Sequence, residues 1–296
     1  MVFVAAAVAA VLAAAVAVAD GNGCPVIEPD VVLLTRVPKC GSTALREMMR
    51  KAAGRTAYTH TKLPYKSDAF IPLPDADAAE IALAHNRTFD HHRLYTDFAA
   101  RGLPKPTYIS VVRHPVERLE SAHYMWEYER RKSGKTSGPL QDFDTCLREG
   151  SGHFCQFPKG HTDKASVMGA YFCGFEPECR NGTYAYAAAR KNIVDSYAVI
   201  GVSEDMYGTL GLLQKVMPGV FGKLRANEAL RKQNETPGRK RTPISPEMRA
   251  MLEKELAAEI DLYNWILSRF ERQKGACKVN TRVKKQQPKR RLRQVK

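Results

Sequence analysis

The 296-residue sequence predicts a three-layer α/β domain in which a central parallel sheet is flanked by helices. Three short apolar runs, at 31–35, 107–112 and 197–202, have the composition of buried strands, and each is followed by a segment of helical composition. Strands that alternate with helices favour parallel pairing through right-handed crossovers. With 44% hydrophobic residues, the chain can fill one sizeable core. This excludes a collagen-like, disordered or disulfide-only chain.

The helices are expected in the order of the strands that they follow. Composition predicts helices over 44–53, 116–131, 184–195 and 204–216. A further helix starts at Ser245, an N-cap residue followed by Pro246 at the first helical position. From there apolar residues recur at three- and four-residue steps as far as Phe270, which predicts one amphipathic stripe. The polar segments 132–138 and 227–243 are expected to be loops.

The net charge of +15 points to a polyanionic partner, whether nucleic acid, anionic lipid or acidic polysaccharide. Nine of the basic residues lie within 278–296, a segment that contains no Asp or Glu. We expect this segment to be a basic disordered tail, so that +6 is left for the rest of the chain.

The N-terminal residues predict the compartment. Residues 2–19 are an uncharged run of Ala and Val with one Phe and one Leu, and the Ala-Val-Ala that precedes Asp20 resembles a signal-peptidase site. The run is also just long enough to span a membrane as a signal anchor. We therefore assign 1–19 to a signal peptide or a signal anchor and 20–30 to a short stem. Either alternative sends the remaining chain into the secretory lumen.

Two cysteine pairs fit an oxidising lumen. Cys146 and Cys155 are close in sequence, as are Cys173 and Cys179, and both pairs sit among loop-forming residues. We interpret them as two local disulfides. A zinc site is the alternative, but neither pair has the two-residue spacing of a zinc knuckle.

Other features agree with a secretory chain. Cys24 and Cys277 are candidates for a third disulfide that joins the ends of the domain. Three Asn-X-Ser/Thr sequons begin at Asn86, Asn181 and Asn234, each in a polar stretch that suits glycosylation.

The segment that follows the first strand, Arg36-Val-Pro-Lys-Cys-Gly-Ser-Thr43, has the properties of a phosphate-binding loop. Gly41 allows close approach of the backbone, the N–H groups at the helix start attract an anion, and Lys39 adds a positive charge. An ordinary Gly-containing turn is the alternative. The order is not that of a Walker A loop, because the lysine precedes the glycine, and we find no clear Walker B carboxylate for magnesium.

A second phosphate site is predicted at the end of the second strand. Arg113 follows that strand directly, and Ser121 lies about two helical turns further on. A guanidinium and a hydroxyl in this arrangement can bind phosphate through charge-assisted hydrogen bonds. With the first loop, they predict a nucleotide that carries phosphates at two places.

These motifs resemble those of Golgi sulfotransferases. The loop 36–43 resembles their 5′-phosphosulfate loop, and Ser110-Val-Val-Arg-His-Pro-Val-Glu-Arg-Leu-Glu-Ser121 resembles their 3′-phosphate motif. Within that group the chain is similar to the heparan sulfate 2-O-sulfotransferase and uronyl 2-sulfotransferase family, from about residue 31 to about residue 273. The further matching segments are Phe143–Cys146, Tyr171–Gly174 through Cys179, Ala189–Asn192 and Gly201–Glu204.

The resemblance implies a P-loop sulfotransferase-like fold over 31–277, both local disulfides, and 3′-phosphoadenosine 5′-phosphosulfate (PAPS) as sulfuryl donor, with no metal. Lys39 would contact the bridging oxygen and stabilise the leaving phosphate. Arg113 and Ser121 would bind the 3′-phosphate, and the basic loop 239–241 is a candidate to close over the nucleotide. The 5′-phosphosulfate would be held by Cys40, Gly41, Ser42, Thr43 and Ala44. Cys40 itself is expected to be a free thiol.

The resemblance places the general base on His92, which would take the proton from a sugar hydroxyl as it attacks sulfur. The neighbouring His91 is the rival base. The family's first histidine in this segment falls on Asp90, which is a departure, and one interpretation is that Asp90 orients His92. A second departure is His114, where the family usually has Asp.

An anionic polysaccharide is the expected acceptor. Arg130 and Arg131 match a basic run that contacts the acceptor in the family, although a solvated helix end is the alternative. Arg93, beside the proposed base, is a candidate to pair with a uronic acid carboxylate.

The sequence therefore predicts a PAPS-dependent sulfotransferase that acts on the 2-hydroxyl of a uronic acid in a glycosaminoglycan such as heparan or chondroitin/dermatan sulfate. The alternatives are a sulfotransferase of another sugar position or polysaccharide, or a non-catalytic heparin-binding protein. We expect a Golgi membrane protein with a luminal catalytic domain, or a cleaved and secreted one, with no nucleic acid partner. A homo-oligomer is compatible with the sequence.

Overall fold

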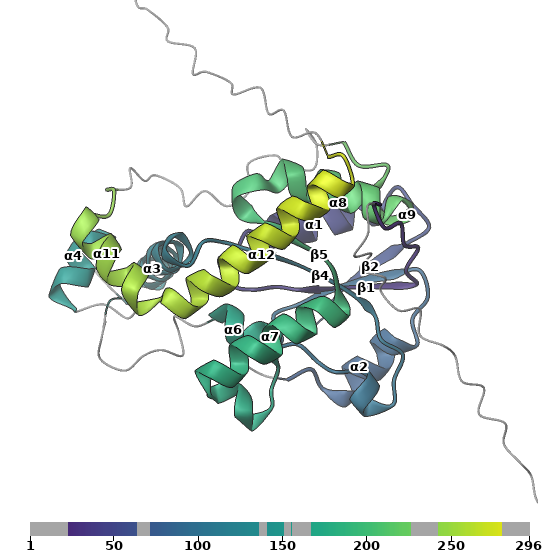
Figure 1. The fold of residues 1–296 in the computed structure, drawn as a ribbon, viewed down its shortest axis with the longest axis horizontal. Helices are drawn as coiled ribbons and strands as arrows, with labels where there is room; N and C mark the ends of the chain where they lie inside the picture. The colour runs from purple at the N-terminus through teal and green to yellow at the C-terminus, as the bar shows by residue number, and fades with distance from the viewer. Residues whose placement is uncertain are drawn as a thin grey trace, which may run out of the picture.

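The computed structural model describes residues 23–63, 72–135, 141–150, 155, 167–225 and 242–279 (Figure 1). The predicted signal or anchor segment, the sequon at Asn234, the basic loop 239–241 and the tail beyond residue 279 lie outside the described residues. Within the described part, no helix combines the length and the apolar composition needed to cross a bilayer.

Five parallel strands form one sheet in the order β2-β3-β1-β4-β5. The three predicted strands are present as β1, β4 and β5, and the sheet gains two strands, β2 and β3, that the sequence did not predict. Because β1 is central and its neighbours β3 and β4 run parallel to it, the carboxyl ends of these three strands lie side by side. The strands are β1 (Val31–Thr35), β2 (Thr59–Lys62), β3 (Arg87–His91), β4 (Thr107–Val112) and β5 (Tyr197–Val202).

Helices cover both faces of the sheet, which confirms the predicted fold class. In Figure 1, α1 and α8 lie on one side of the sheet and α2, α6 and α7 on the other. The four helices predicted from composition are present as α1, α3, α7 and α8, each within two residues of its predicted ends. The helices are α1 (Ser42–Ala53), α2 (Asp75–Ala82), α3 (Pro115–Lys132), α4 (Phe143–Glu149), α6 (Val167–Cys173), α7 (Gly182–Ser196), α8 (Met206–Val216), α9 (Pro218–Phe221), α11 (Pro246–Glu255) and α12 (Ala257–Ala276), with short 3-10 helices η1 (Ala99–Arg101), η2 (Pro177–Arg180) and η3 (Ser203–Asp205).

The C-terminal amphipathic stripe forms two helices rather than one. Ser245 caps α11 as predicted, because its hydroxyl accepts a hydrogen bond from the Met248 N–H. The helical hydrogen bonds of α11 end at Leu256, whose backbone (φ −97°, ψ 14°) separates α11 from α12. The apolar spacing continues across this break, so the periodicity alone could not locate it.

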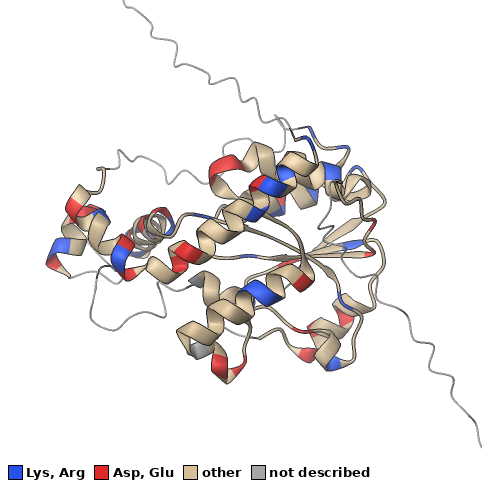
Figure 2. Ribbon diagram, in the orientation of Figure 1, with Lys and Arg blue, Asp and Glu red and all other residues tan. Residues whose placement is uncertain are grey.

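Helix α12 packs along β5, the strand at one edge of the sheet. The Arg269 guanidinium donates to the Tyr197 carbonyl at 2.7 Å, and the Gln273 amide donates to the Ala198 carbonyl at 2.9 Å. These bonds satisfy backbone acceptors that an edge strand would otherwise expose. Along α12 two of the three acidic residues lie in the N-terminal half and all three basic residues lie in the C-terminal half, which suits the helix dipole (Figure 2).

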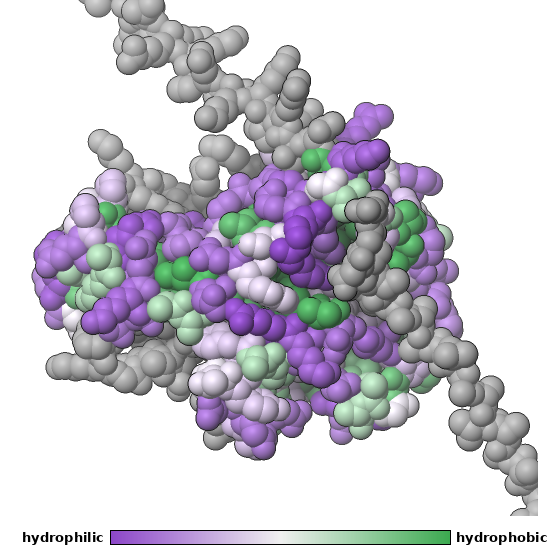
Figure 3. Space-filling view, in the orientation of Figure 1, coloured by the Kyte–Doolittle hydropathy of each residue, from purple (hydrophilic) through white to green (hydrophobic). Residues whose placement is uncertain are grey.

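Two hydrophobic clusters stabilise the fold. The larger surrounds the sheet, and the smaller joins α3, α4 and α11 through side chains such as Leu119, Phe143 and Leu252. The face seen in Figure 3 is mostly hydrophilic, with apolar residues in small separate groups.

Three disulfides close the described chain. Cys146–Cys155 and Cys173–Cys179 are the two predicted local bridges. Cys24–Cys277 is the third and ties the start of the domain to the end of α12. Cys40 is a buried free thiol, as expected.

Both described sequons are accessible. Asn86 is exposed in a left-handed backbone conformation that Asn tolerates (φ 49°), and Asn181 is exposed at the N-cap of α7. The Asn181 side-chain oxygen accepts from the Tyr184 N–H at 3.3 Å, which leaves its amide nitrogen for glycan attachment.

Candidate active site

The predicted loop 36–43, His92 and Arg113 each follow a strand that ends at the same edge of the parallel sheet. The backbone register pairs Thr35 of β1 with His91 of β3 on one side and with Ser110 of β4 on the other. The Ser110 hydroxyl donates to the Thr35 carbonyl at 2.7 Å, and the Tyr197 hydroxyl donates to the Thr35 side chain at 3.0 Å. These bonds join the end of β1 to β4 and to the first residue of β5. The carboxyl edge of a parallel sheet is where α/β folds bind their ligands.

The predicted phosphate-binding loop leaves β1 at this edge and enters α1. Lys39 and Gly41 both have positive φ, 64° and 81°, so the loop turns sharply before the helix. Helix α1 starts at Ser42, two residues earlier than predicted, and Gly41 at its N-cap offers no side-chain acceptor to the first N–H groups. A helix start whose N–H groups lack a capping side chain is suited to an anion.

The Cys40 thiol in this loop is not a nucleophile. It is completely buried, and burial raises its pKa to about 12. It is therefore a neutral packing group beneath the loop.

The second predicted anion site follows β4. Arg113 leaves the strand end and Ser121 lies on α3, and both are partly exposed. Among the described residues, neither the guanidinium nor the hydroxyl has a hydrogen-bond partner. A cation and a hydroxyl donor near one strand end can therefore receive an anion without breaking an existing bond.

His114, the departure from the family pattern, has a structural role at the start of α3. It occupies the N-cap without a side-chain cap, and its Nδ1 contacts the Glu117 carboxylate three residues later. Burial alone would raise the pKa of Glu117, but hydrogen bonds from His114 and Arg249 outweigh it and lower the pKa to about 2. The ionised Glu117 in the first turn supplies the negative charge that an Asp cap would provide.

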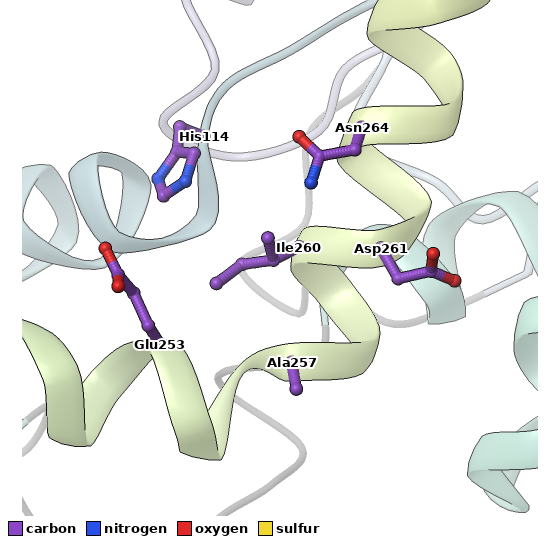
Figure 4. A pocket seen from close by; sticks show the side chains of 6 residues that line it. All are labelled: His114, Glu253, Ala257, Ile260, Asp261 and Asn264. Atoms are coloured by element: carbon purple, nitrogen blue, oxygen red, sulfur yellow. The ribbon is translucent and has the colours of Figure 1, made fainter.

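A pocket of about 420 Å³ opens beside His114, between the start of α3 and helices α11 and α12 (Figure 4). Its lining includes the carboxylates Glu253 and Asp261. Two carboxylates disfavour an anionic ligand, so we place no part of a phosphate-bearing donor there.

His92 lies just after β3, next to the loop. Its Nδ1 is 2.8 Å from the Arg36 carbonyl oxygen, and a carbonyl only accepts, so Nδ1 carries the proton and Nε2 carries the lone pair of the neutral ring. Burial and then the Arg36 charge lower the pKa of His92 to about 4. The ring is therefore neutral over the physiological pH range and can accept a proton at Nε2.

His91 is less suited to accept a proton. Its Nδ1 already accepts the Arg93 backbone N–H at 2.9 Å, so the proton of the neutral ring is on the buried Nε2. Burial lowers the pKa of His91 to about 3. The lone pair that a base needs is thus occupied in this histidine.

The contacts of Asp90 are with Arg36 and His60 rather than with His92, so it can orient His92 only through a neighbouring residue. Its carboxylate is buried and binds the Arg36 guanidinium at 2.9 Å. The other carboxylate oxygen lies 3.2 Å from Nε2 of His60, an ion-pair contact rather than a well-aligned hydrogen bond. A role for Arg36 or His60 was not predicted from the sequence, because β2 and β3 were not predicted and the contacts join residues far apart in the chain.

The three arginines proposed for the acceptor are at different distances from this edge. Arg93 is buried two residues after β3, and its guanidinium has no hydrogen bond or ion pair with a described residue. Arg130 and Arg131 are in the last turn of α3, about 22 Å from Pro115 at the helical rise of 1.5 Å per residue. The structure thus brings Arg93 to the site and leaves the other two at a distance.

Comparisons with known proteins identify the family of the chain. Residues 25–172, half of the chain, match the sulfotransferase family. The chain belongs to the sulfotransferase family. It is 28% identical over 286 residues to the uronyl 2-sulfotransferase homolog pip of Drosophila melanogaster, a match that covers 86% of this chain and 55% of that protein.

Other relatives of this sulfotransferase-family chain carry related names. It is 25% identical to human uronyl 2-sulfotransferase, over 87% of this chain and 66% of that protein. It is 29% identical to mouse heparan sulfate 2-O-sulfotransferase 1, over 66% of this chain and 57% of that protein. The chain therefore spans between about half and two thirds of the length of these relatives. The resemblance predicted from the motifs is confirmed.

Proposed function

We propose that this chain transfers a sulfuryl group from PAPS to the 2-hydroxyl of a uronic acid in a glycosaminoglycan. One observation carries the proposal: an anion-binding loop after β1 adjoins a neutral histidine after β3 whose Nδ1–H is fixed by the Arg36 carbonyl. The loop suits a phosphosulfate and the histidine suits a hydroxyl. The names of the relatives describe sulfuryl transfer to the 2-position of uronyl residues and of heparan sulfate.

The residues at the donor site fit PAPS by their chemistry. The loop from Cys40 to Ala44 would bind the 5′-phosphosulfate with backbone N–H groups and the hydroxyls of Ser42 and Thr43, and Lys39 would neutralise the leaving phosphate. Arg113 and Ser121 would bind the 3′-phosphate. The absence of a hydrogen-bond partner for the Arg113 guanidinium among the described residues supports this role.

His92 would act as general base in a single displacement. The sugar oxygen forms a bond to sulfur while the bond from sulfur to the bridging oxygen of the donor breaks. The hydroxyl proton goes to Nε2 of His92, and adenosine 3′,5′-bisphosphate leaves. Such proton transfer contributes typically ~10²–10⁴-fold to the rate. An anionic donor close to His92 would favour its protonated form and so raise its pKa, which makes it a stronger base when the donor is bound.

The acceptor would be an anionic polysaccharide. Arg93 is buried at the site without an ion-pair partner among the described residues, which supports a contact with the carboxylate of the reacting sugar. Arg130 and Arg131, at the far end of α3, would contact a more distant part of the polymer. The distance between the strand ends and the last turn of α3 suits an extended polysaccharide rather than a monosaccharide.

The compartment that fits this proposal is the secretory lumen, with the Golgi membrane as the site of action. Three disulfides and two accessible sequons support an oxidising, glycosylating environment. Residues 1–19 would either anchor the chain or be cleaved.

Sulfate transfer from labelled PAPS tests the proposal. The purified chain should label desulfated heparan, chondroitin or dermatan in a panel, and digestion should locate the label on the 2-position of a uronic acid. His92→Ala and Lys39→Ala should each abolish transfer and still bind polysaccharide.

Matched variants serve as controls. His85→Ala removes a strongly exposed histidine, and Lys254→Ala removes an exposed lysine on α11, so both should keep wild-type transfer. Polysaccharide binding without any transfer by the wild-type chain would instead favour the non-catalytic alternative. Wild-type transfer by both His92→Ala and Lys39→Ala would refute the assigned roles.

A further inference from the structure

A buried chain of ionisable groups crosses three strands next to the proposed site. It starts at His60 on β2, whose Nδ1 is 2.9 Å from the Thr88 hydroxyl and whose Nε2 is 3.2 Å from the Asp90 carboxylate on β3. The other oxygen of Asp90 accepts from the Arg36 guanidinium, which follows β1, at 2.9 Å. The side chains of Asp90 and Arg36 are 0% and 8% exposed. Burying three ionisable groups is costly unless they pair, so their contacts are strongly constrained.

Arg36 connects this chain to both halves of the proposed site. Its guanidinium also donates to the Thr43 hydroxyl in the donor loop at 3.3 Å. Its backbone carbonyl accepts the Nδ1–H of His92 at 2.8 Å, and its backbone N–H donates to the His91 carbonyl at 2.9 Å. The position of Arg36 therefore sets the orientation of the His92 ring and the placement of the loop hydroxyl.

We infer that Asp90 is a positioning residue for the proposed sulfuryl transfer: by holding Arg36, it aims Nε2 of His92 at the acceptor and keeps Thr43 in the donor loop. The inference rests on the proposed function. Asp90 is buried and already contacts Arg36 and His60, so its carboxylate cannot contact the substrate directly. An indirect role through Arg36 explains why a carboxylate is present at this position. His60 supports Asp90 from the β2 side, so the device spans β2, β3 and β1.

The charge of Asp90 also acts on His92. Among the charges that act on His92, those of Arg36 after β1 and Arg46 on α1 lower its pKa, and that of Asp90 raises it. Removing the Asp90 carboxylate leaves the positive charges of Arg36 and Arg46 near His92 without the negative charge that offsets them. The pKa of His92 should then fall further, and the acidic limb of the rate profile should move to lower pH.

Asp90→Asn and Asp90→Ala separate hydrogen bonding from charge. Asn keeps an oxygen that can accept from Arg36 but removes the charge, whereas Ala removes both. Asp97→Asn, an exposed carboxylate on the following loop, is the matched control. For each variant we would measure kcat and KM with PAPS and desulfated heparan, affinity for adenosine 3′,5′-bisphosphate, thermal unfolding, and the pH dependence of kcat. Asp90→Asn supplies the test if Asp90→Ala does not fold.

We expect kcat to fall about 10- to 100-fold in Asp90→Asn and further in Asp90→Ala, as misplacement of a catalytic group predicts. KM and affinity for adenosine 3′,5′-bisphosphate should change much less. The acidic limb should shift to lower pH in both variants, and Asp97→Asn should match the wild type. A wild-type kcat in Asp90→Asn, or a loss of activity with an unshifted acidic limb and a matching loss of folded protein, would overturn the inference.

A measurement without turnover separates this inference from the proposed function. In ¹⁵N spectra of the imidazole rings, His92 should be the Nδ1–H tautomer in the wild type and lose that preference in Asp90→Ala or Asp90→Asn. If the wild type transfers no sulfate, the proposed function fails, and the ring spectra still decide whether Asp90 positions His92. Unchanged His92 signals in both variants would refute the positioning role in either case.

Discussion

The disulfide Cys24–Cys277 should stabilise the fold much more than either short bridge. It joins residues 253 positions apart, whereas Cys173–Cys179 joins residues 6 apart. In the chain-entropy description a disulfide removes conformational freedom from the unfolded state in proportion to the logarithm of the loop length. That relation gives about 5 kcal/mol for the long loop and about 2 kcal/mol for the short one. We therefore predict a difference of about 3 kcal/mol between the two double Cys→Ser variants.

Urea unfolding of the oxidised wild type and of both double variants tests this prediction. The variant without Cys24–Cys277 should lose the larger free energy of unfolding. It should also show a larger m-value, because its unfolded chain is no longer held together at its ends and exposes more surface. Cys173→Ser/Cys179→Ser is the control for removing two sulfurs from a loop. Equal losses in the two variants, or a larger loss for the short bridge, would refute the entropic reasoning.

Three further predictions concern single residues. Glu259 is buried, which raises its pKa to about 7 from an ordinary 4.5, so its contribution to the free energy of unfolding should fall by about 3 kcal/mol as the pH rises through that interval. Urea unfolding of Glu259→Gln should show a smaller decline over that interval than the wild type, and equal slopes would contradict the assignment. Ser245→Ala should lower the free energy of unfolding by about 1 kcal/mol, because α11 loses its cap. Ser245→Thr keeps a capping hydroxyl and should keep the wild-type free energy of unfolding, so an equal loss in that variant would contradict a role in capping alone. Asn181→Gln, expressed through a secretory pathway, should lose the mass of one glycan, and an unchanged mass would exclude modification there.

Much of the fold could be predicted from the sequence, because three of the five strands are mostly apolar. β1, β4 and β5 are fully or almost fully buried, so each appears as a mostly hydrophobic run. β2 and β3 were missed because their composition is polar. β2 is Thr-His-Thr-Lys at an edge, and β3 buries Thr88, Asp90 and His91. These side chains are buried at little cost only because partners on other strands bind them, and a single sequence does not show those partners.

In the candidate site, too, the local features could be predicted and the long-range contacts could not. The loop from Arg36 to Thr43 is contiguous, so its residue types and spacing predicted an anion-binding turn. The orientation of His92 depends on a carbonyl 56 residues away in the chain, and the role of Asp90 depends on Arg36, 54 residues away. Contacts at such separations follow from the order of the strands. The strands that carry His60 and Asp90, β2 and β3, were not predicted from the sequence.

The cover that α12 provides for β5 restricts how copies of this chain can associate. A strand from another molecule would need the Tyr197 and Ala198 carbonyls, which Arg269 and Gln273 already occupy. Extending the sheet at this side would require α12 to leave, and α12 is linked to the start of the domain through the disulfide that follows it at Cys277. Among the described residues, a strand added beside the start of β5 would therefore have to displace these two hydrogen bonds, which disfavours an oligomer built through this part of the sheet edge.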